Sequence, residues 1–191
     1  MKTNPNSKIV LRQFRLFFFL ATIPLVAWGC SGIDPKRMAP KASAQPATRV
    51  GGSVRVMDVT GGKKSTFGGA EMINDDQFKQ ALVLALQQSG LFNQVSTDRG
   101  DVDLFATIRS ESQKTSRGLQ YTATMVVTYK FVDHATSNVV WTASYDSEFS
   151  STAFSGATRT LEAREGSARE NLASLIQGIR QQWPKKQAAG L

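Results

Sequence analysis

The sequence predicts an α+β domain, a two-layer sandwich in which an antiparallel sheet of about four strands carries two helices on one face. Three observations lead to this fold class. Several segments alternate apolar and polar residues, which is typical of strands with one buried face. Two other segments repeat apolar residues at helical spacing. The predicted elements follow one another in the order β-α-β-β-β-α, so the helices flank a meander of strands.

The first predicted strand is Ser53–Thr60, in which Val54 and Val56 alternate with polar neighbours. The glycine-rich segment 61–69 follows it and is expected to be a loop. Its two lysines follow the first two glycines too closely for the spacing of a phosphate-binding loop. The segment therefore predicts a flexible connection and no nucleotide site.

A helix is predicted to begin at Asn74, because asparagine is a preferred N-cap and Gln77 can complete a capping box. Glycine at position 90 is expected to end this helix in a left-handed conformation. A short strand is expected near Gln94–Ser96. The apolar stripe of the helix consists of Phe78, Ala81, Leu82, Ala85 and Leu86.

Three further strands are expected in segments 101–112, 119–133 and 139–149, and the last two form a hairpin. In segment 119–133, one face is apolar and the other is polar, which indicates an antiparallel sheet with one solvated face. The apolar face holds Tyr121, Ala123, Met125, Val127, Tyr129 and Phe131, and the polar face holds Thr122, Thr124, Thr128 and Lys130.

The last predicted element is a helix over residues 158–183, ended by Pro184 and followed by a disordered tail, 185–191. The folded domain is thus expected to cover residues 50–184. The apolar side chains at helical spacing are Leu161, Ala168, Leu172, Leu175, Ile176, Ile179 and Trp183. Its polar face carries Glu162, Arg164, Glu165, Arg169 and Arg180.

Two features of this helix predict specific contacts. Glu165 and Arg169 are four residues apart, so an ion pair between them would stabilise the helix by about 0.3 kcal/mol. Gly166 in a helix interior costs about 1 kcal/mol relative to alanine. We therefore expect close approach of another segment at Gly166, either the sheet of the same chain or a partner.

The net charge of +8 does not indicate nucleic-acid binding, because of where the charge lies. Segments 1–29 and 30–49 carry +4 and +3, whereas residues 50–191 hold fifteen basic and fourteen acidic side chains. A nucleic-acid-binding domain is expected to carry a basic stripe on its folded surface. The nearly neutral domain predicts no nucleic-acid partner.

The first 29 residues predict a signal peptide. Basic residues precede an uncharged segment, 16–28, which is short for a membrane-spanning helix and suits the apolar region of a secretory signal. The lone cysteine, Cys30, follows Gly29. This junction resembles the lipobox of bacterial lipoproteins, and the resemblance implies that Cys30 is lipidated and becomes the new N-terminus. Ala27 and Trp28 depart from the leucine and the small residue of that motif.

Two other interpretations of the leader remain open. Ala42 and Ala44 could mark a conventional cleavage site and a soluble secreted product, although that site lies far beyond the apolar segment. The leader could also remain uncleaved as an anchor. Residues 30–49, with three prolines, predict a lipidated flexible tether. Ser31 implies, by the same resemblance, the periplasmic side of the outer membrane.

Three blocks of the domain resemble a family of small, uncharacterised proteobacterial lipoproteins: "FKQALVLALQQSGLF", "YKFVDHATSNVVWTASY" and "LEAREGSARENLASLI". The resemblance spans roughly residues 50–181. The architecture is loosely similar to lipopolysaccharide-assembly lipoproteins and to transport auxiliary lipoproteins, which implies partner binding without catalysis. Only Cys30 carries over as a functional residue.

The sequence offers no catalytic, metal-binding or cofactor-binding set. His134 is the only histidine, and its place in a hairpin turn beside Asp133 predicts a solvated residue. A Ser-His-Asp triad stays open, although no GxSxG motif marks a serine. Asp98, Asp101 and Asp103 lack the spacing and the glutamate of a calcium loop. We therefore expect no enzyme, no metal and no cofactor.

These observations predict a membrane-anchored envelope lipoprotein that acts in the periplasm as a non-catalytic binding or assembly module. Its partner is expected to be another envelope protein or envelope component. The candidate surfaces are an edge strand and the threonine-rich face of segment 119–133. The alternative is a periplasmic hydrolase or transferase that uses carboxylate side chains, which would need a cleft with two acids of raised pKa.

Overall fold

The computed structural model describes residues 32–41, 49–63, 72–116 and 120–188, and it describes side chains up to residue 183. The predicted signal peptide, Cys30 and residues 42–48 of the predicted tether lie outside these ranges. The elements are α1 (Pro35–Met38), β1 (Ser53–Thr60), α2 (Asp75–Ser89), β2 (Gln94–Ser96), β3 (Val102–Ser116), β4 (Gln120–Asp133), β5 (Val139–Ser151) and α3 (Gly156–Ala188).

The α+β class is confirmed, but the predicted antiparallel sheet of about four strands is wrong. The sheet is mixed and has five strands in the order β2-β1-β3-β4-β5. Strand β1 runs parallel to both β2 and β3, whereas β4 is antiparallel to both of its neighbours, β3 and β5. The reason is the connection: α2 crosses over between β1 and the strands that follow, and such a crossover returns the chain in the same direction.

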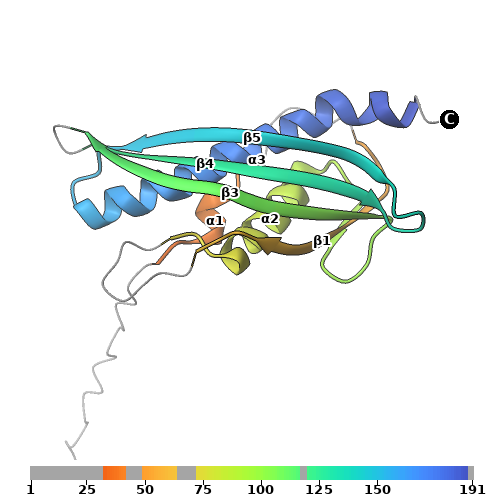
Figure 1. Cartoon of the computed structure of the whole chain (residues 1–191), viewed down its shortest axis with the longest axis horizontal. Coiled ribbons are helices and arrows are strands. Elements are labelled where there is room, and N and C mark those ends of the chain that lie inside the picture. Colours follow the sequence, from red (N-terminus) through yellow and green to blue (C-terminus); the bar gives the residue numbers. More distant parts are fainter. Residues whose placement is uncertain (1–31, 42–48, 64–71, 117–119, 189–191) are drawn as a thin grey trace, which may run out of the picture. The chain divides into compact units, whose positions relative to one another are not determined.

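The helices pack on one face of the sheet, as predicted, and a third short helix joins them. Figure 1 shows the long α3 running along β4 and β5, with α2 beside β1. The predicted apolar stripe of α2 is buried. An aromatic cluster continues the core beneath α3, formed by Phe92, Phe131, Trp141 and Trp183. The opposite face of the sheet carries the polar side chains.

Both predicted ends of α2 are confirmed. The Asn74 side chain accepts a hydrogen bond from the Gln77 amide at 2.8 Å, and the Gln77 side chain accepts one from the Asn74 amide at 3.1 Å. These two bonds satisfy amides that the first helical turn leaves unpaired. Gly90 ends the helix with φ of 63°, in the left-handed region.

The N-terminal part of the predicted flexible tether is folded, which corrects the prediction for residues 33–39. Ile33, Met38 and Ala39 are buried in the common core, and α1 contacts both α2 and α3. The Asp34 side chain caps α1 by accepting a hydrogen bond from the Lys36 amide. A few apolar side chains in a proline-rich segment are enough to dock it, because they pack against both α2 and α3, contacts that sequence composition does not reveal.

Helix α3 is longer than predicted at both ends. It begins at Gly156 and continues through Pro184, the predicted end, to Ala188 in the predicted disordered tail. Proline removes one amide donor and strains the preceding turn. The buried side chain of Trp183 anchors that turn to the core. Among the described residues, no helix is both long and apolar enough to cross a membrane.

Candidate functional site

The threonine-rich face predicted as a binding surface lies on the side of the sheet that the helices leave uncovered. Its hydroxyl groups hydrogen-bond across neighbouring strands at 2.6–2.8 Å, in the pairs Ser112–Thr124, Thr122–Ser150 and Thr128–Ser144. Since each hydroxyl both donates and accepts, these pairs still offer hydrogen-bonding capacity to a ligand. We call this surface the hydroxyl face.

Strand β5 forms one edge of the sheet and is much longer than β2 at the other edge. On one side it pairs with β4 over twelve register positions, which run from Tyr121 opposite Ser151 to Val132 opposite Val139. Its other side has no neighbouring strand within the described residues. Asp146 and Glu148 place negative charge on the exposed face of this edge. An unpaired strand of this length can accept another strand, and its charges restrict which strands can add.

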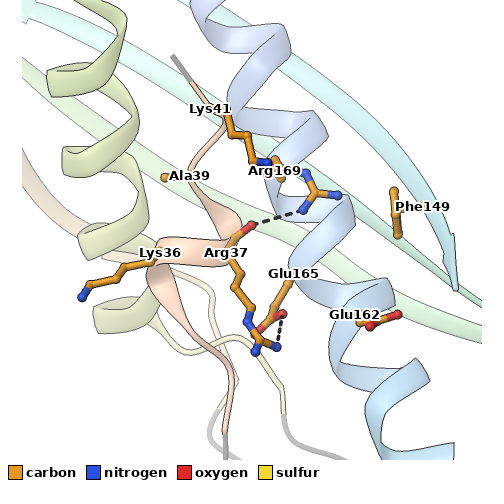
Figure 2. A pocket seen from close by; sticks show the side chains of 8 residues that line it. All are labelled: Lys36, Arg37, Ala39, Lys41, Phe149, Glu162, Glu165 and Arg169. Carbon is orange, nitrogen blue, oxygen red and sulfur yellow. Dashed lines mark hydrogen bonds and ion pairs between the residues drawn. The ribbon is translucent and has the colours of Figure 1, made fainter. Parts of the chain in front are cut away.

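A pocket of about 480 Å³ opens between residues 33–41, α3 and the end of β5. We call residues 33–41 the N-terminal segment. Figure 2 shows its labelled side chains: Lys36, Arg37, Ala39, Lys41, Phe149, Glu162, Glu165 and Arg169. Four of these are cationic and two are acidic. Sequence analysis missed this pocket, because residues 36–41 lie more than 100 positions from Phe149 and from the residues of α3 that complete it.

Arg169 does not form the predicted ion pair with Glu165. Its guanidinium lies 5.1 Å from the centre of the Phe149 ring, and its Nη1 donates a hydrogen bond to the Arg37 carbonyl at 3.4 Å (Figure 2). Glu165 instead accepts a hydrogen bond from the Asp34 amide at 2.8 Å and lies 3.7 Å from Arg37 Nη1. Glu165 and Arg169 were expected to pair with each other. Instead, both bind groups of the folded N-terminal segment.

The two glutamates of the pocket both serve structural contacts. Burial raises the pKa of the Glu165 carboxyl, and the hydrogen bond from the Asp34 amide and the charge of Arg37 offset this only in part. Glu162 accepts a hydrogen bond from the Ser151 hydroxyl at 2.6 Å. These contacts join α3 to the N-terminal segment and to the end of β5.

The predicted close approach at Gly166 is confirmed within the chain. A Cβ atom at this position would lie 2.2 Å from Cδ1 of Phe149, so only glycine lets the ring lie against the helix. Five residues further along the helix, the buried Asn171 accepts a hydrogen bond from the Tyr129 hydroxyl and donates one to the Tyr145 carbonyl, both at 2.8 Å. Gly166 and Asn171 together set how α3 lies on β4 and β5.

His134 is not the purely solvated turn residue that the sequence predicts. Its side chain is 54% exposed, yet its Nδ1 lies 3.1 Å from Oδ2 of Asp103. Asp103 also accepts two hydrogen bonds from Arg55, at 2.7 and 2.8 Å. Asp101, two residues earlier, accepts a hydrogen bond from the Ser53 hydroxyl at 2.7 Å. Both carboxylates therefore bind groups of this chain.

The contacts of Asp103 predict a pH-dependent contribution to stability. The hydrogen bonds from Arg55 hold the pKa of Asp103 below its usual value, and His134 adds to the effect. Asp103→Asn is expected to lower the free energy of unfolding by about 1–2 kcal/mol at pH 7. Because the folded pKa is the lower one, this contribution is complete above the unfolded pKa and is lost as the pH falls through the folded pKa.

Thermal unfolding of the wild type and of Asp103→Asn between pH 7 and pH 3 measures this contribution. The stability gap between the two proteins should be widest at neutral pH and should close in acid. A gap that stays constant over this range would show that the charge of Asp103 does not stabilise the fold.

Comparisons with known proteins establish the fold of the chain. No protein-family model matches it, and no curated protein matches its sequence. A crystal structure of a Xanthomonas campestris protein described as DUF330 aligns with a TM-score of 0.59 at 16% identity, covering 80% of this chain and 98% of that chain. At this identity the likeness shows that the two proteins share an α+β fold.

Two further solved structures are more distant. The PelC dodecamer from Paraburkholderia phytofirmans aligns with a TM-score of 0.48 at 15% identity, covering 72% of this chain and 94% of that chain. A minor lipoprotein from Acinetobacter baumannii aligns with a TM-score of 0.43 at 10% identity, covering 67% of this chain and 91% of that chain. Both likenesses are too remote to support an inference on function.

Proposed function

We propose that this protein is a bacterial envelope lipoprotein, anchored through lipids on Cys30, whose folded domain binds a partner in the periplasm without catalysing a reaction. The membrane is expected to be the outer one, with the domain on its periplasmic side. The proposal rests on the leader–cysteine junction of the sequence and on the way the chain after Cys30 joins the fold.

The observation that carries the proposal is the burial of Ile33, which is 5% exposed. Ile33 lies three residues after Cys30, and three extended residues span at most about 10 Å. A lipid-bearing Cys30 would therefore hold the domain directly against the bilayer. Several acyl chains on one residue give stable attachment, because each buried methylene contributes about 0.8 kcal/mol.

Two surfaces are available to a partner of such an anchored domain. The hydroxyl face offers paired Ser and Thr side chains across three strands. The edge of β5 offers backbone groups for strand addition. We assign the partner contact to these surfaces and expect the partner to be another envelope protein or envelope component.

The alternative, a hydrolase or transferase that uses carboxylates, would use the pocket that holds Glu162 and Glu165. The raised pKa of Glu165 is a feature of catalytic acids. However, Glu165 is held by the Asp34 amide and Arg37, and Glu162 is held by Ser151. A general acid or base needs a carboxyl group within reach of a substrate proton, so these contacts favour the binding module.

The proposal predicts that Cys30→Ala removes the protein from membranes and also removes its partner contact. The experiment expresses the full chain with a photoreactive residue in place of Thr124 and labels the cells with palmitate. The wild-type background should give a labelled, membrane-bound protein and a crosslinked adduct of defined mass. Cys30→Ala should give neither, because an unanchored domain is no longer concentrated beside its partner.

A photoreactive residue in place of Gln80, which is exposed on α2, is the matched control and should give no such adduct. Palmitate label that persists after Cys30→Ala would contradict the lipid anchor. Equal adducts from positions 80 and 124 would contradict the assignment of the partner contact to the hydroxyl face.

A further inference from the structure

We propose that the pocket lined by Lys36, Arg37, Lys41 and Arg169 binds a phosphate group, namely the headgroup phosphate of an anionic phospholipid such as phosphatidylglycerol. The choice of a lipid as the source of the phosphate rests on the proposed function. The recognition of phosphate rests on the geometry of the pocket alone.

The charge balance of the pocket favours an anion. Four cationic side chains line it against two carboxylates. Glu165 is turned toward the Asp34 amide and Arg37, and Glu162 toward the Ser151 hydroxyl. Within the described residues, neither carboxylate forms an ion pair with Lys36, Lys41 or Arg169. A bound anion would neutralise the positive charge that the two carboxylates leave in the pocket.

Arg169 is the side chain best prepared to hold the phosphate. The Phe149 ring lies against its guanidinium, and the Arg37 carbonyl binds its Nη1. Stacking of this kind orients a guanidinium and leaves its edge N–H groups for a ligand. An oriented guanidinium can donate two parallel hydrogen bonds to phosphate, which a flexible lysine cannot do.

The size and walls of the pocket fit a lipid headgroup. A cavity of about 480 Å³ lies within the range of roughly 300–1,000 Å³ that is common for small-molecule sites. Phe149 and Ala39 supply apolar wall beside the cationic side chains. A glycerophosphate group with the first methylenes of its acyl chains needs both kinds of surface.

The position of the pocket in the chain brings it to the membrane. Three of its cationic residues, Lys36, Arg37 and Lys41, lie six to eleven residues after Cys30. The intervening segment is docked on α2 and α3 through Ile33 and Met38. If Cys30 lies in the bilayer, the pocket is therefore presented close to the headgroups, where basic residues attract anionic lipids.

The test is native mass spectrometry of the full chain, purified from membranes in detergent and mixed with either phosphatidylglycerol or phosphatidylethanolamine. We expect a one-to-one adduct with phosphatidylglycerol and weaker binding of phosphatidylethanolamine, whose headgroup carries no net charge. Arg169→Gln should weaken the phosphatidylglycerol adduct about tenfold, the loss expected for a charge-assisted hydrogen bond.

Arg109→Gln is the matched control, because Arg109 lies on the sheet face away from the helices and bonds to Thr128. It removes the same charge and should leave the adduct unchanged. Phe149→Leu, which keeps the charge but removes the ring, should weaken the adduct as well. Thermal unfolding of each variant checks that the domain is folded. Equal binding by wild type and Arg169→Gln, or equal loss in Arg109→Gln, would overturn the proposal.

The two sources of phosphate are separated by competition. Glycerol phosphate at millimolar concentration should displace phosphatidylglycerol only weakly, since it lacks the acyl stems. Displacement at micromolar concentration would overturn the lipid assignment in favour of a soluble phosphate. The intact mass reports separately whether Cys30 carries acyl chains, so failure of the anchor and failure of the pocket give different results.

Discussion

Replacing Arg164 with methionine is expected to lower the free energy of unfolding by about 3–5 kcal/mol, the cost of breaking a buried ion pair on one side. Arg164 is 4% exposed and pairs through Nη1 with Glu111, which is also buried. Its Nη2 donates a hydrogen bond to Gln113 Oε1 at 3.0 Å. After the substitution, the hydrogen bond that the Glu111 carboxylate keeps within the described residues comes from the Ile73 amide, at 3.3 Å.

The loss in Arg164→Met should also depend on pH. Burial raises the pKa of Glu111 even with Arg164 present. Without the guanidinium the folded pKa rises further, so the loss relative to wild type grows as the pH rises from the wild-type folded pKa towards the higher folded pKa of the variant. Urea unfolding at pH 7 and pH 4.5 measures this, and the loss relative to wild type should be smaller at the lower pH.

The double variant Arg164→Met with Glu111→Leu is the control for the ion pair. It buries no charge, so it should recover most of the stability that the single variant loses. If the double variant is as unstable as Arg164→Met, the lost stability comes from the packing of the arginine side chain between α3 and β3 and not from its charge.

Replacing Gly166 with alanine is the second large effect, an expected loss of about 1–3 kcal/mol from overpacking. On an exposed helix the same change would stabilise by about 1 kcal/mol. Here the new Cβ would lie 2.2 Å from Cδ1 and 2.3 Å from Cγ of Phe149. Because Cγ itself is too close, a rotation of the ring about its own axis cannot relieve the clash, and Phe149 must change its χ1 rotamer or the strand must shift.

Chemical unfolding of Gly166→Ala, Phe149→Ala and the double variant checks this contact. The double variant should lose less stability than the two single losses added together, because removing the ring makes room for the methyl group. Gln177→Ala, at an exposed position of the same helix, should change stability little. Additive losses in the double variant would contradict a clash between residues 149 and 166.

Some parts of this protein follow from the sequence because their causes are local. The capping box of Asn74 and Gln77 and the left-handed Gly90 define α2 through bonds within a few residues. The alternation in segment 119–133 separates the hydroxyl face from the core, since a strand has a period of two. Gly166 predicted a close contact because a glycine inside a helix is unfavourable unless another group needs the space.

Other parts were decided by tertiary structure. Alternation assigns side chains to faces but carries no information on strand direction, so the parallel pairing of β1 with β2 and β3 was not predicted. Arg169 had a sequence neighbour of opposite charge, yet it stacks on Phe149 from a distant strand.

The candidate site depends on the same kind of long-range contact. The segment after Cys30 reads as a linker, and it folds only because α2 and α3 together form a surface that buries Ile33 and Met38. Docking of this segment then brings Lys36, Arg37 and Lys41 to Arg169 on α3. The sequence by itself thus determined the local elements, the apolar and polar faces and the candidate lipidation residue. The pocket exists only once the chain has folded, because no local pattern encodes contacts between residues more than 100 positions apart.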